Sequence, residues 1–143
     1  RYERPDASVY EGGWKHDERA GHGRISYAVG DTFVGDWRAN KKHGVGTYTW
    51  TRGMKFKGKW QDGRMHGNGL LRFPDGRTYE GGFIDNVPTG HGALVGKGTK
   101  IEGKWKEGRL VQKWVGAPPQ LQTVDQAGPD AVVLPPLPPA CNP

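Results

Sequence analysis

The stretch that decides the fold is Phe56-Lys57-Gly58-Lys59-Trp60, in which an aromatic residue, a glycine and a tryptophan stand at alternate positions. The related pentapeptides are Tyr10-Glu11-Gly12-Gly13-Trp14, Phe33-Val34-Gly35-Asp36-Trp37, Tyr79-Glu80-Gly81-Gly82-Phe83 and Ile101-Glu102-Gly103-Lys104-Trp105. Successive copies begin 23, 23, 23 and 22 residues apart, and the missing residue belongs to the stretch Gly96-Lys97-Gly98. A fixed period of this length is the signature of a repeat architecture.

A second glycine-rich anchor keeps the same register within each repeat. Its copies are Gly21-His22-Gly23, Gly44-Val45-Gly46, Gly67-Asn68-Gly69 and Gly90-His91-Gly92, each followed by apolar residues at alternate positions. Side chains two residues apart share one face of a β-strand. Polar pairs such as Asp62-Gly63 separate the two anchors. Asp-Gly predicts a hairpin turn, because glycine adopts a positive φ at no steric cost.

The two anchors together predict an all-β fold: a single-layer solenoid of antiparallel β-hairpins, with a strand about every 11 residues and no substantial helix. The composition agrees, since only 34% of residues are hydrophobic and 24 are glycines. Aromatic rings bury much area per residue, so rings can form the core of a thin fold. The glycines beside them predict room for the ring of a neighbouring repeat.

The spacing divides the chain into three parts. Four repeats occupy residues 10–32, 33–55, 56–78 and 79–100, and a half-repeat at 101–112 closes an array that extends to residue 116. Residues 1–9 are interpreted as the trailing half of a preceding repeat, because Pro5-Asp6 precedes Gly23 as Pro74-Asp75 precedes Gly92. An extended proline-rich tail, residues 117–143, holds eight of the 11 prolines.

The order Tyr-Glu-Gly-x-Trp, then His-Gly-x-Gly, resembles the MORN repeat over about residues 10–110. His43-Gly44-Val45-Gly46 and His66-Gly67-Asn68-Gly69 carry the resemblance best. The departures are Phe83, Asn86 and Pro88 in the fourth repeat and Val111-Gln112 in the fifth. The resemblance implies a protein-binding or membrane-proximal module. MORN arrays occur in cytoskeletal, ciliary and junctional proteins, and some are attached to lipid kinases or a lysine methyltransferase.

No constellation of residues points to catalysis or to metal binding. The histidines, which are His16, His22, His43, His66 and His91, have no Cys, Asp or Glu at a metal-ligand spacing. The Gly-x-Gly anchor lacks the third glycine and the following helix of a dinucleotide site, and neither a P-loop nor a nucleophile elbow is present. We therefore expect no enzyme activity, no cofactor and no small-molecule substrate. A single cysteine, Cys141, suits a reducing compartment and hence the cytoplasm.

The positive charge lies on the repeats. The formal net charge is +6, and residues 117–143 contain no Lys or Arg. A basic array favours acidic partners, although the same charge also serves solubility. An anionic phospholipid would be bound through Lys15, Arg38, Lys41, Lys42, Lys55 and Lys57. Stacking of nucleic-acid bases is disfavoured, because the rings recur where the fold itself needs them.

Two surfaces are candidates for binding a partner protein. The first is an aromatic face, whose rings mainly pack the fold but can also hold an extended or helical peptide: Trp14, Trp37, Trp60, Tyr27, Trp50 and Phe73. The second is the tail, with Leu134, Pro135, Pro136, Leu137, Pro138 and Pro139. This run favours polyproline II and resembles a ligand of WW-type or SH3-type grooves, but it is also typical of a linker.

These observations lead us to expect a non-catalytic protein-binding scaffold. The expected setting is a cytoskeletal assembly, above all the axoneme of a cilium or flagellum, in which the array binds a partner and the tail lies on a neighbouring subunit. Two alternatives stay open. One is a membrane-proximal module that binds anionic phospholipid, and the other is the regulatory arm of a larger enzyme.

Overall fold

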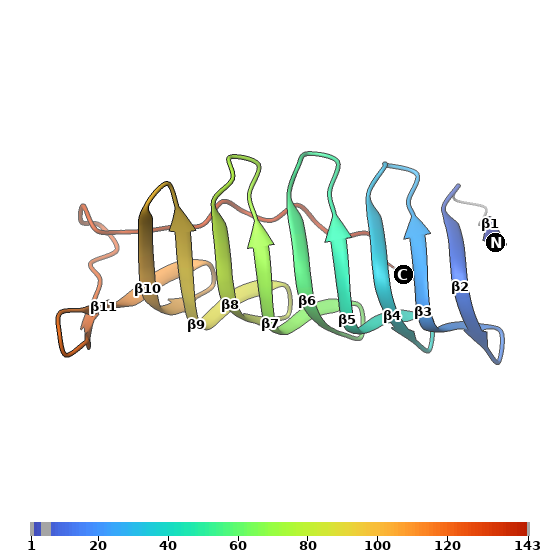
Figure 1. Ribbon diagram of the computed structural model, residues 1–143, viewed down its shortest axis with the longest axis horizontal. Helices are drawn as coiled ribbons and strands as arrows, with labels where there is room; N and C mark the ends of the chain where they lie inside the picture. The colour runs from blue at the N-terminus through green and yellow to red at the C-terminus, as the bar shows by residue number, and fades with distance from the viewer. Residues whose placement is uncertain (1, 4–6, 143) are drawn as a thin grey trace.

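The protein is built from one open sheet in which every strand pairs antiparallel with the next (Figure 1). The computed structural model describes residues 2–3 and 7–142. Its strands are β1 (Tyr2–Glu3), β2 (Val9–Lys15), β3 (Glu18–Ser26), β4 (Thr32–Arg38), β5 (Lys41–Thr49), β6 (Lys55–Gln61), β7 (Arg64–Arg72), β8 (Thr78–Ile84), β9 (Val87–Gly96), β10 (Thr99–Lys106), β11 (Arg109–Val115) and β12 (Gln120–Thr123). No helix occurs in the described residues. The prediction of an all-β antiparallel hairpin array is therefore confirmed.

Two-residue turns close the hairpins along one edge of the ribbon. Between β4 and β5, Ala39 and Asn40 have φ values of 48° and 70°, and between β6 and β7, Asp62 and Gly63 have φ values of 48° and 84°. A positive φ at both central residues defines a type I′ turn, whose twist matches that of the flanking strands. The hairpin predicted at Asp62-Gly63 is thus confirmed.

The turns along the opposite edge join one repeat to the next and are longer. Each of the first three begins with an aromatic residue whose N–H donates to the carbonyl oxygen four residues on: Tyr27 to Asp31, Trp50 to Met54 and Phe73 to Arg77. Between β9 and β10, Lys97 and Gly98 instead form a short turn with φ values of 33° and 78°. This shorter connection accounts for the single 22-residue step.

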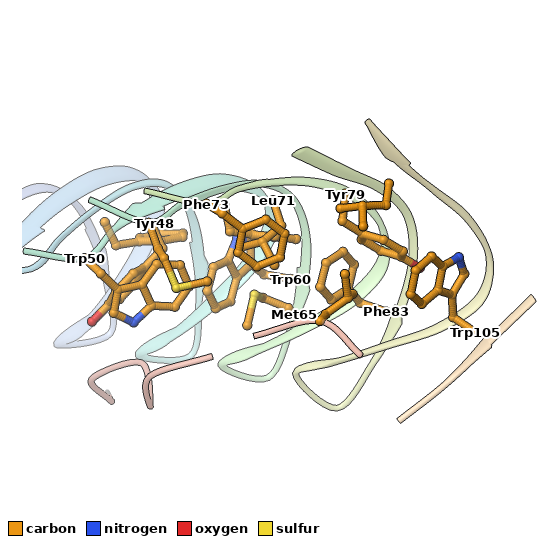
Figure 2. Packing of buried hydrophobic residues seen from close by; sticks show 14 of the residues in the cluster. Tyr48, Trp50, Trp60, Met65, Leu71, Phe73, Tyr79, Phe83 and Trp105 are labelled. Atoms are coloured by element: carbon orange, nitrogen blue, oxygen red, sulfur yellow. The ribbon is translucent and has the colours of Figure 1, made fainter. Parts of the chain in front are cut away.

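The inward-curving face of the sheet, here called the inner face, carries a ladder of aromatic rings (Figure 2). Its members are the first rings, Tyr10, Phe33, Phe56 and Tyr79, and the fifth-position rings, Trp37, Trp60, Phe83 and Trp105, and all of them are buried. Phe33, for example, makes edge-to-face contacts with Trp37 of its own repeat at 5.4 Å and with Trp60 of the next at 5.1 Å. Such contacts stabilise beyond simple burial. The ladder therefore joins hairpins that would be marginal alone.

The second glycine of each Gly-x-Gly anchor lies directly against a ring. A Cβ atom on Gly46 would lie 2.3 Å from Phe33 Cζ, and one on Gly69 would lie 2.3 Å from Phe56 Cε1. The ring belongs to the same repeat, so the prediction that a neighbouring repeat's ring lies there is wrong. The neighbour contributes a hydrogen bond instead: Trp60 Nε1–H donates to the Gly46 carbonyl oxygen at 3.1 Å. A side chain at these positions would displace the ring.

The sheet extends beyond the four predicted full repeats at both ends. At the N-terminal end, β1 pairs with β2 through Tyr2 and Tyr10. The preceding turn predicted at Pro5-Asp6 lies outside the described residues. At the other end, β11 is a full strand although Val111-Gln112 replaces the His-Gly of the anchor, and β12 adds a strand from within the tail. The predicted half-repeat is thus a complete hairpin.

Candidate peptide-binding site

A column of residues lies on the inner face beside the ring ladder, one from the second strand of each hairpin. This inner column consists of Arg19, Lys42, Met65, Pro88 and Leu110, all of which are buried. Each pairs across its hairpin with a fifth-position aromatic residue, as Lys42 does with Trp37 and Met65 with Trp60. The column is cationic at its N-terminal end and apolar towards its C-terminal end.

The tail turns back and runs along the array, so that the C-terminus lies near β4 in Figure 1. It first meets the end of the inner column. The Leu110 N–H donates to the Val132 carbonyl oxygen at 3.1 Å, and the Leu134 N–H donates to the Gly108 carbonyl oxygen at 2.9 Å. These paired main-chain hydrogen bonds hold residues 132–134 in the way that an added β-strand is held by a sheet.

Apolar side chains carry the middle of this contact. Leu134 is 4% exposed and belongs to the core, while Leu137 and Cys141 are partly buried against it. Met65 and Pro88 of the inner column line a pocket together with tail residues 133–140. The proline-rich run therefore crosses the apolar half of the inner column.

Polar contacts fix the tail further along the inner face. Trp50 Nε1–H donates to the Pro139 carbonyl oxygen at 3.4 Å, and the Cys141 N–H donates to Tyr48 Oη at 2.9 Å. The Tyr48 hydroxyl in turn donates to Asp31 Oδ2 at 2.7 Å. Burial, and the bond to Asp31, raise the pKa of Tyr48 above its usual value. Tyr48 therefore stays a neutral hydroxyl that binds array and tail at once.

Lys42 binds the last described residues of the tail from a fully buried position. Its Nζ donates to the Cys141 carbonyl oxygen and, at 3.1 Å, to Asn142 Oδ1. Five ring centroids lie 5.1–5.9 Å from this Nζ, those of Tyr27, Phe33, Trp37, Tyr48 and Trp60. Such rings stabilise a cation in place of water. Burial nevertheless lowers the pKa of Lys42 to about 7, and the Arg19 charge acts in the same direction.

The structure places the six rings proposed for partner binding in two groups. Tyr27, Trp37, Trp50, Trp60 and Phe73 are at most 8% exposed, whereas Trp14 is 46% exposed. Of the six, only Trp14 therefore has a ring that a partner can reach in this conformation. The other five pack in the core of the chain's own array and tail, and their contact with a partner stays a prediction.

The proline-rich run proposed as a second binding surface lies on the chain's own array. Leu134, Pro135, Pro136, Leu137, Pro138 and Pro139 all line the pocket described above. The sequence predicted a ligand of WW-type or SH3-type grooves that lies on a neighbouring subunit, or a linker. In the structure it is an extended segment bound to the inner face (Figure 1).

Of the six cations proposed for lipid binding, five are exposed and one is buried. Lys15, Arg38, Lys41, Lys55 and Lys57 are exposed. Lys42 has no exposed surface, because its strand position faces the ring ladder and the tail covers it. It therefore has no access to a lipid headgroup in this conformation. Lys59, which is not among these six, is exposed at the next alternate position of β6.

Sequence reasoning missed the inner column. The spacing of Arg19, Lys42, Met65 and Pro88 follows the 23-residue period and would have revealed it. By contrast, no sequence signal connects Tyr48 and Asp31 with the tail, since these contacts bridge up to 93 residues.

Three of the histidines, His22, His66 and His91, each lie beside a single carboxylate and not in a cluster. His22 lies 3.8 Å from Asp36, and His91 lies 3.3 Å from Glu102. Within residues 2–3 and 7–142, no three His, Cys, Asp or Glu side chains come together as a metal ion would require. The same part of the chain contains no helix of the length and apolarity needed to cross a membrane.

The fold and the site define a class: a single-layer β-hairpin repeat protein whose inner face holds an extended peptide segment. The MORN repeat pattern matches residues 10–32, 33–55, 56–76 and 79–99, which together are more than half of the chain. The chain therefore belongs to the MORN-repeat family, as the resemblance implied. No curated protein matches it.

Proposed function

We propose that this chain is a non-catalytic protein-binding scaffold, a structural subunit of a cytoskeletal assembly in the cytoplasm, in particular the axoneme of a cilium or flagellum. The observation that carries the proposal is the tail on the inner face. An extended segment is bound there through main-chain atoms at both ends of its path and through leucine side chains between them. MORN repeats are generally protein- or lipid-binding repeats, which supports the same reading of the array.

The chemistry of the inner face supports binding without catalysis. The face is lined by rings and by apolar members of the inner column, and one of its buried cations, Lys42, binds carbonyl oxygens. The repeats are also joined by one continuous ring ladder, so the array holds its surfaces at fixed distances. Rigid spacing of surfaces is what a structural subunit requires.

The outer face offers a second surface for an assembly. Val45, Leu70 and Val95 are 54%, 40% and 40% exposed. Lys57 pairs with Leu70 across β6 and β7, so apolar and basic side chains alternate over these strands. A mixed surface of this kind suits a protein partner better than a uniformly charged one would.

The experiment is retention of axonemal proteins by the purified, immobilised full chain, followed by cross-linking to map the contact. We expect defined proteins to be retained and cross-linked to the array. The matched variant Lys55→Glu/Lys57→Glu/Lys59→Glu reports whether the outer face contributes. An unrelated protein of equal net charge is the control. Retention of nothing beyond what that control retains would contradict the proposal.

Binding of anionic phospholipid is the second candidate. Lys55 and Lys57 favour it, because they are exposed at alternate positions of β6 and form no ion pair with another described residue. Each cation near an anionic surface contributes about 1 kcal/mol. The chain would then sediment with phosphatidylserine vesicles at low salt and not with phosphatidylcholine vesicles. Unchanged sedimentation of Lys55→Glu/Lys57→Glu would argue against this surface.

A further inference from the structure

The tail binds the inner face mainly through atoms that any extended segment possesses. Main-chain groups of Val132, Leu134, Pro139 and Cys141 make four of the hydrogen bonds described above. Selectivity for side chains comes from apolar contacts, and the most buried of these side chains is that of Leu134. A proline-rich segment is already extended when free, so binding costs it little conformational entropy. The site therefore defines a ligand class wider than the tail itself.

At the end of the tail that the structure describes, the buried cation Lys42 contacts only neutral acceptors of the tail. Lys42 is buried beside Arg19 at the cationic end of the inner column, and Arg19 lies 4.5 Å over the Trp37 ring. The tail offers Lys42 a main-chain carbonyl and the neutral amide of Asn142. Among the residues that the structure describes, no carboxylate forms an ion pair with Lys42. Hydrogen bonds to a carboxylate are roughly twice as strong as those to a neutral acceptor.

We propose that the inner face binds a proline-rich, extended segment of a partner protein that carries a carboxylate where the tail carries the Asn142 amide. The tail is the resident competitor for this site. The segment requires a leucine at the place of Leu134 and a proline-rich run after it, followed by an acidic residue eight positions after the leucine. This inference rests on the proposed function only in taking the partner to be a protein.

The tether gives the tail an advantage that the carboxylate reduces. A flexibly linked segment has an effective concentration on the order of millimolar at its own site. A free segment with the same contacts would lose to it at ordinary protein concentrations. A stronger bond to Lys42 lowers the concentration at which a partner segment displaces the tail, and a segment without the acidic residue needs a higher concentration to do so. The tail thus sets the threshold for binding.

The test uses the full chain with the tail loosened by Leu134→Asp, because Leu134 is 4% exposed. Val133→Asp is the matched control, because Val133 is 55% exposed and the same charge there leaves the tail in place. The probes are fluorescent, C-terminally amidated peptides of residues 129–142 in two forms, the tail sequence and its Asn142→Asp version. Anisotropy measures binding, and circular dichroism checks that each variant keeps the sheet. If Leu134→Asp fails to fold, Leu134→Ala replaces it.

We expect the tail-sequence peptide to bind Leu134→Asp at least about tenfold more tightly than Val133→Asp. The Asn142→Asp peptide should bind roughly fivefold more tightly than the tail sequence. This advantage should vanish in Leu134→Asp/Lys42→Met, where Met reproduces the side chain that Met65 supplies in the next repeat.

Three results would overturn the inference: no saturable binding to the folded, loosened chain, equal affinities of the two peptides, or an advantage that survives Lys42→Met. A wild-type chain that dimerises through its tails, and is made monomeric by Leu134→Asp, would also overturn it in favour of a second copy as occupant. All components are purified, so a negative result leaves the assembly proposal standing. Failure of the extract experiment likewise leaves this site intact.

Discussion

The substitution Gly46→Ala tests the contact on which the ring ladder depends. The added Cβ would lie 2.3 Å from Phe33 Cζ and 2.5 Å from Cε1, well inside the ~3.5 Å contact distance of carbon atoms. The ring has little room to withdraw, because Phe33 is fully buried between Trp37 at 5.4 Å and Trp60 at 5.1 Å. Overpacking of a dense core costs about 1–3 kcal/mol, and this geometry places the loss of unfolding free energy at about 3 kcal/mol.

Gly90→Ala is the control, because it perturbs conformation without a clash. Gly90 has a φ of 91°, and a Cβ there meets nothing within 4 Å. Its expected cost, about 1–2 kcal/mol, arises from the left-handed backbone alone. Urea unfolding followed by circular dichroism and tryptophan fluorescence measures both variants. The steric interpretation requires that Gly46→Ala lower the free energy of unfolding more than Gly90→Ala does.

A double-mutant cycle separates steric cost from other effects. Leucine at position 33 has no atom at the place of Phe33 Cζ, so Gly46→Ala should cost little in a Phe33→Leu background. We expect a coupling free energy of at least about 1.5 kcal/mol between the two substitutions. Equal losses in the two backgrounds would refute the claim that glycine is required at position 46 by the ring.

Three further predictions concern stability. Trp60→Phe removes the N–H that donates to the buried Gly46 carbonyl and should lower the free energy of unfolding by about 1–3 kcal/mol, measured in urea; undiminished stability would contradict it. Burial lowers the pKa of Lys42 to about 7 from 10.5, so the unfolded chain binds this proton more tightly. Stability should therefore rise between these pH values by up to about 1.4 kcal/mol per unit, and Lys42→Met should flatten that rise in unfolding curves across pH. Burial raises the pKa of Tyr48 and Tyr79, so their contribution to stability should be lost as pH rises above about 10. Ultraviolet titration checks this, since the phenols of Tyr48 and Tyr79 should ionise only on unfolding.

The sequence predicts both components of the candidate site, a face of aromatic rings and an extended tail. It does not predict that the tail lies on that face. The alternation in Phe33-Val34-Gly35-Asp36-Trp37 places two rings on one face, and the tail composition predicts an extended segment. The sequence did not connect the ring face with the tail, because neither the ring alternation nor the tail composition indicates that the two segments are in contact. Lys42 shows the reason most clearly. Its charge suggested a solvated basic surface, whereas its place in the inner column buries it under the tail.

The sequence by itself determined the repeat period, the strand and turn positions, and the inward rings with the glycines beside them. These features depend on neighbours along one hairpin, such as Asp62-Gly63, so they are encoded within each repeat. Only the tertiary structure decided which face the tail covers and which cation meets it. Lys42 and Cys141 are 99 residues apart, and their contact depends on how the whole array curves. Contacts of that range follow from the shape of the assembled sheet, which no local pattern contains.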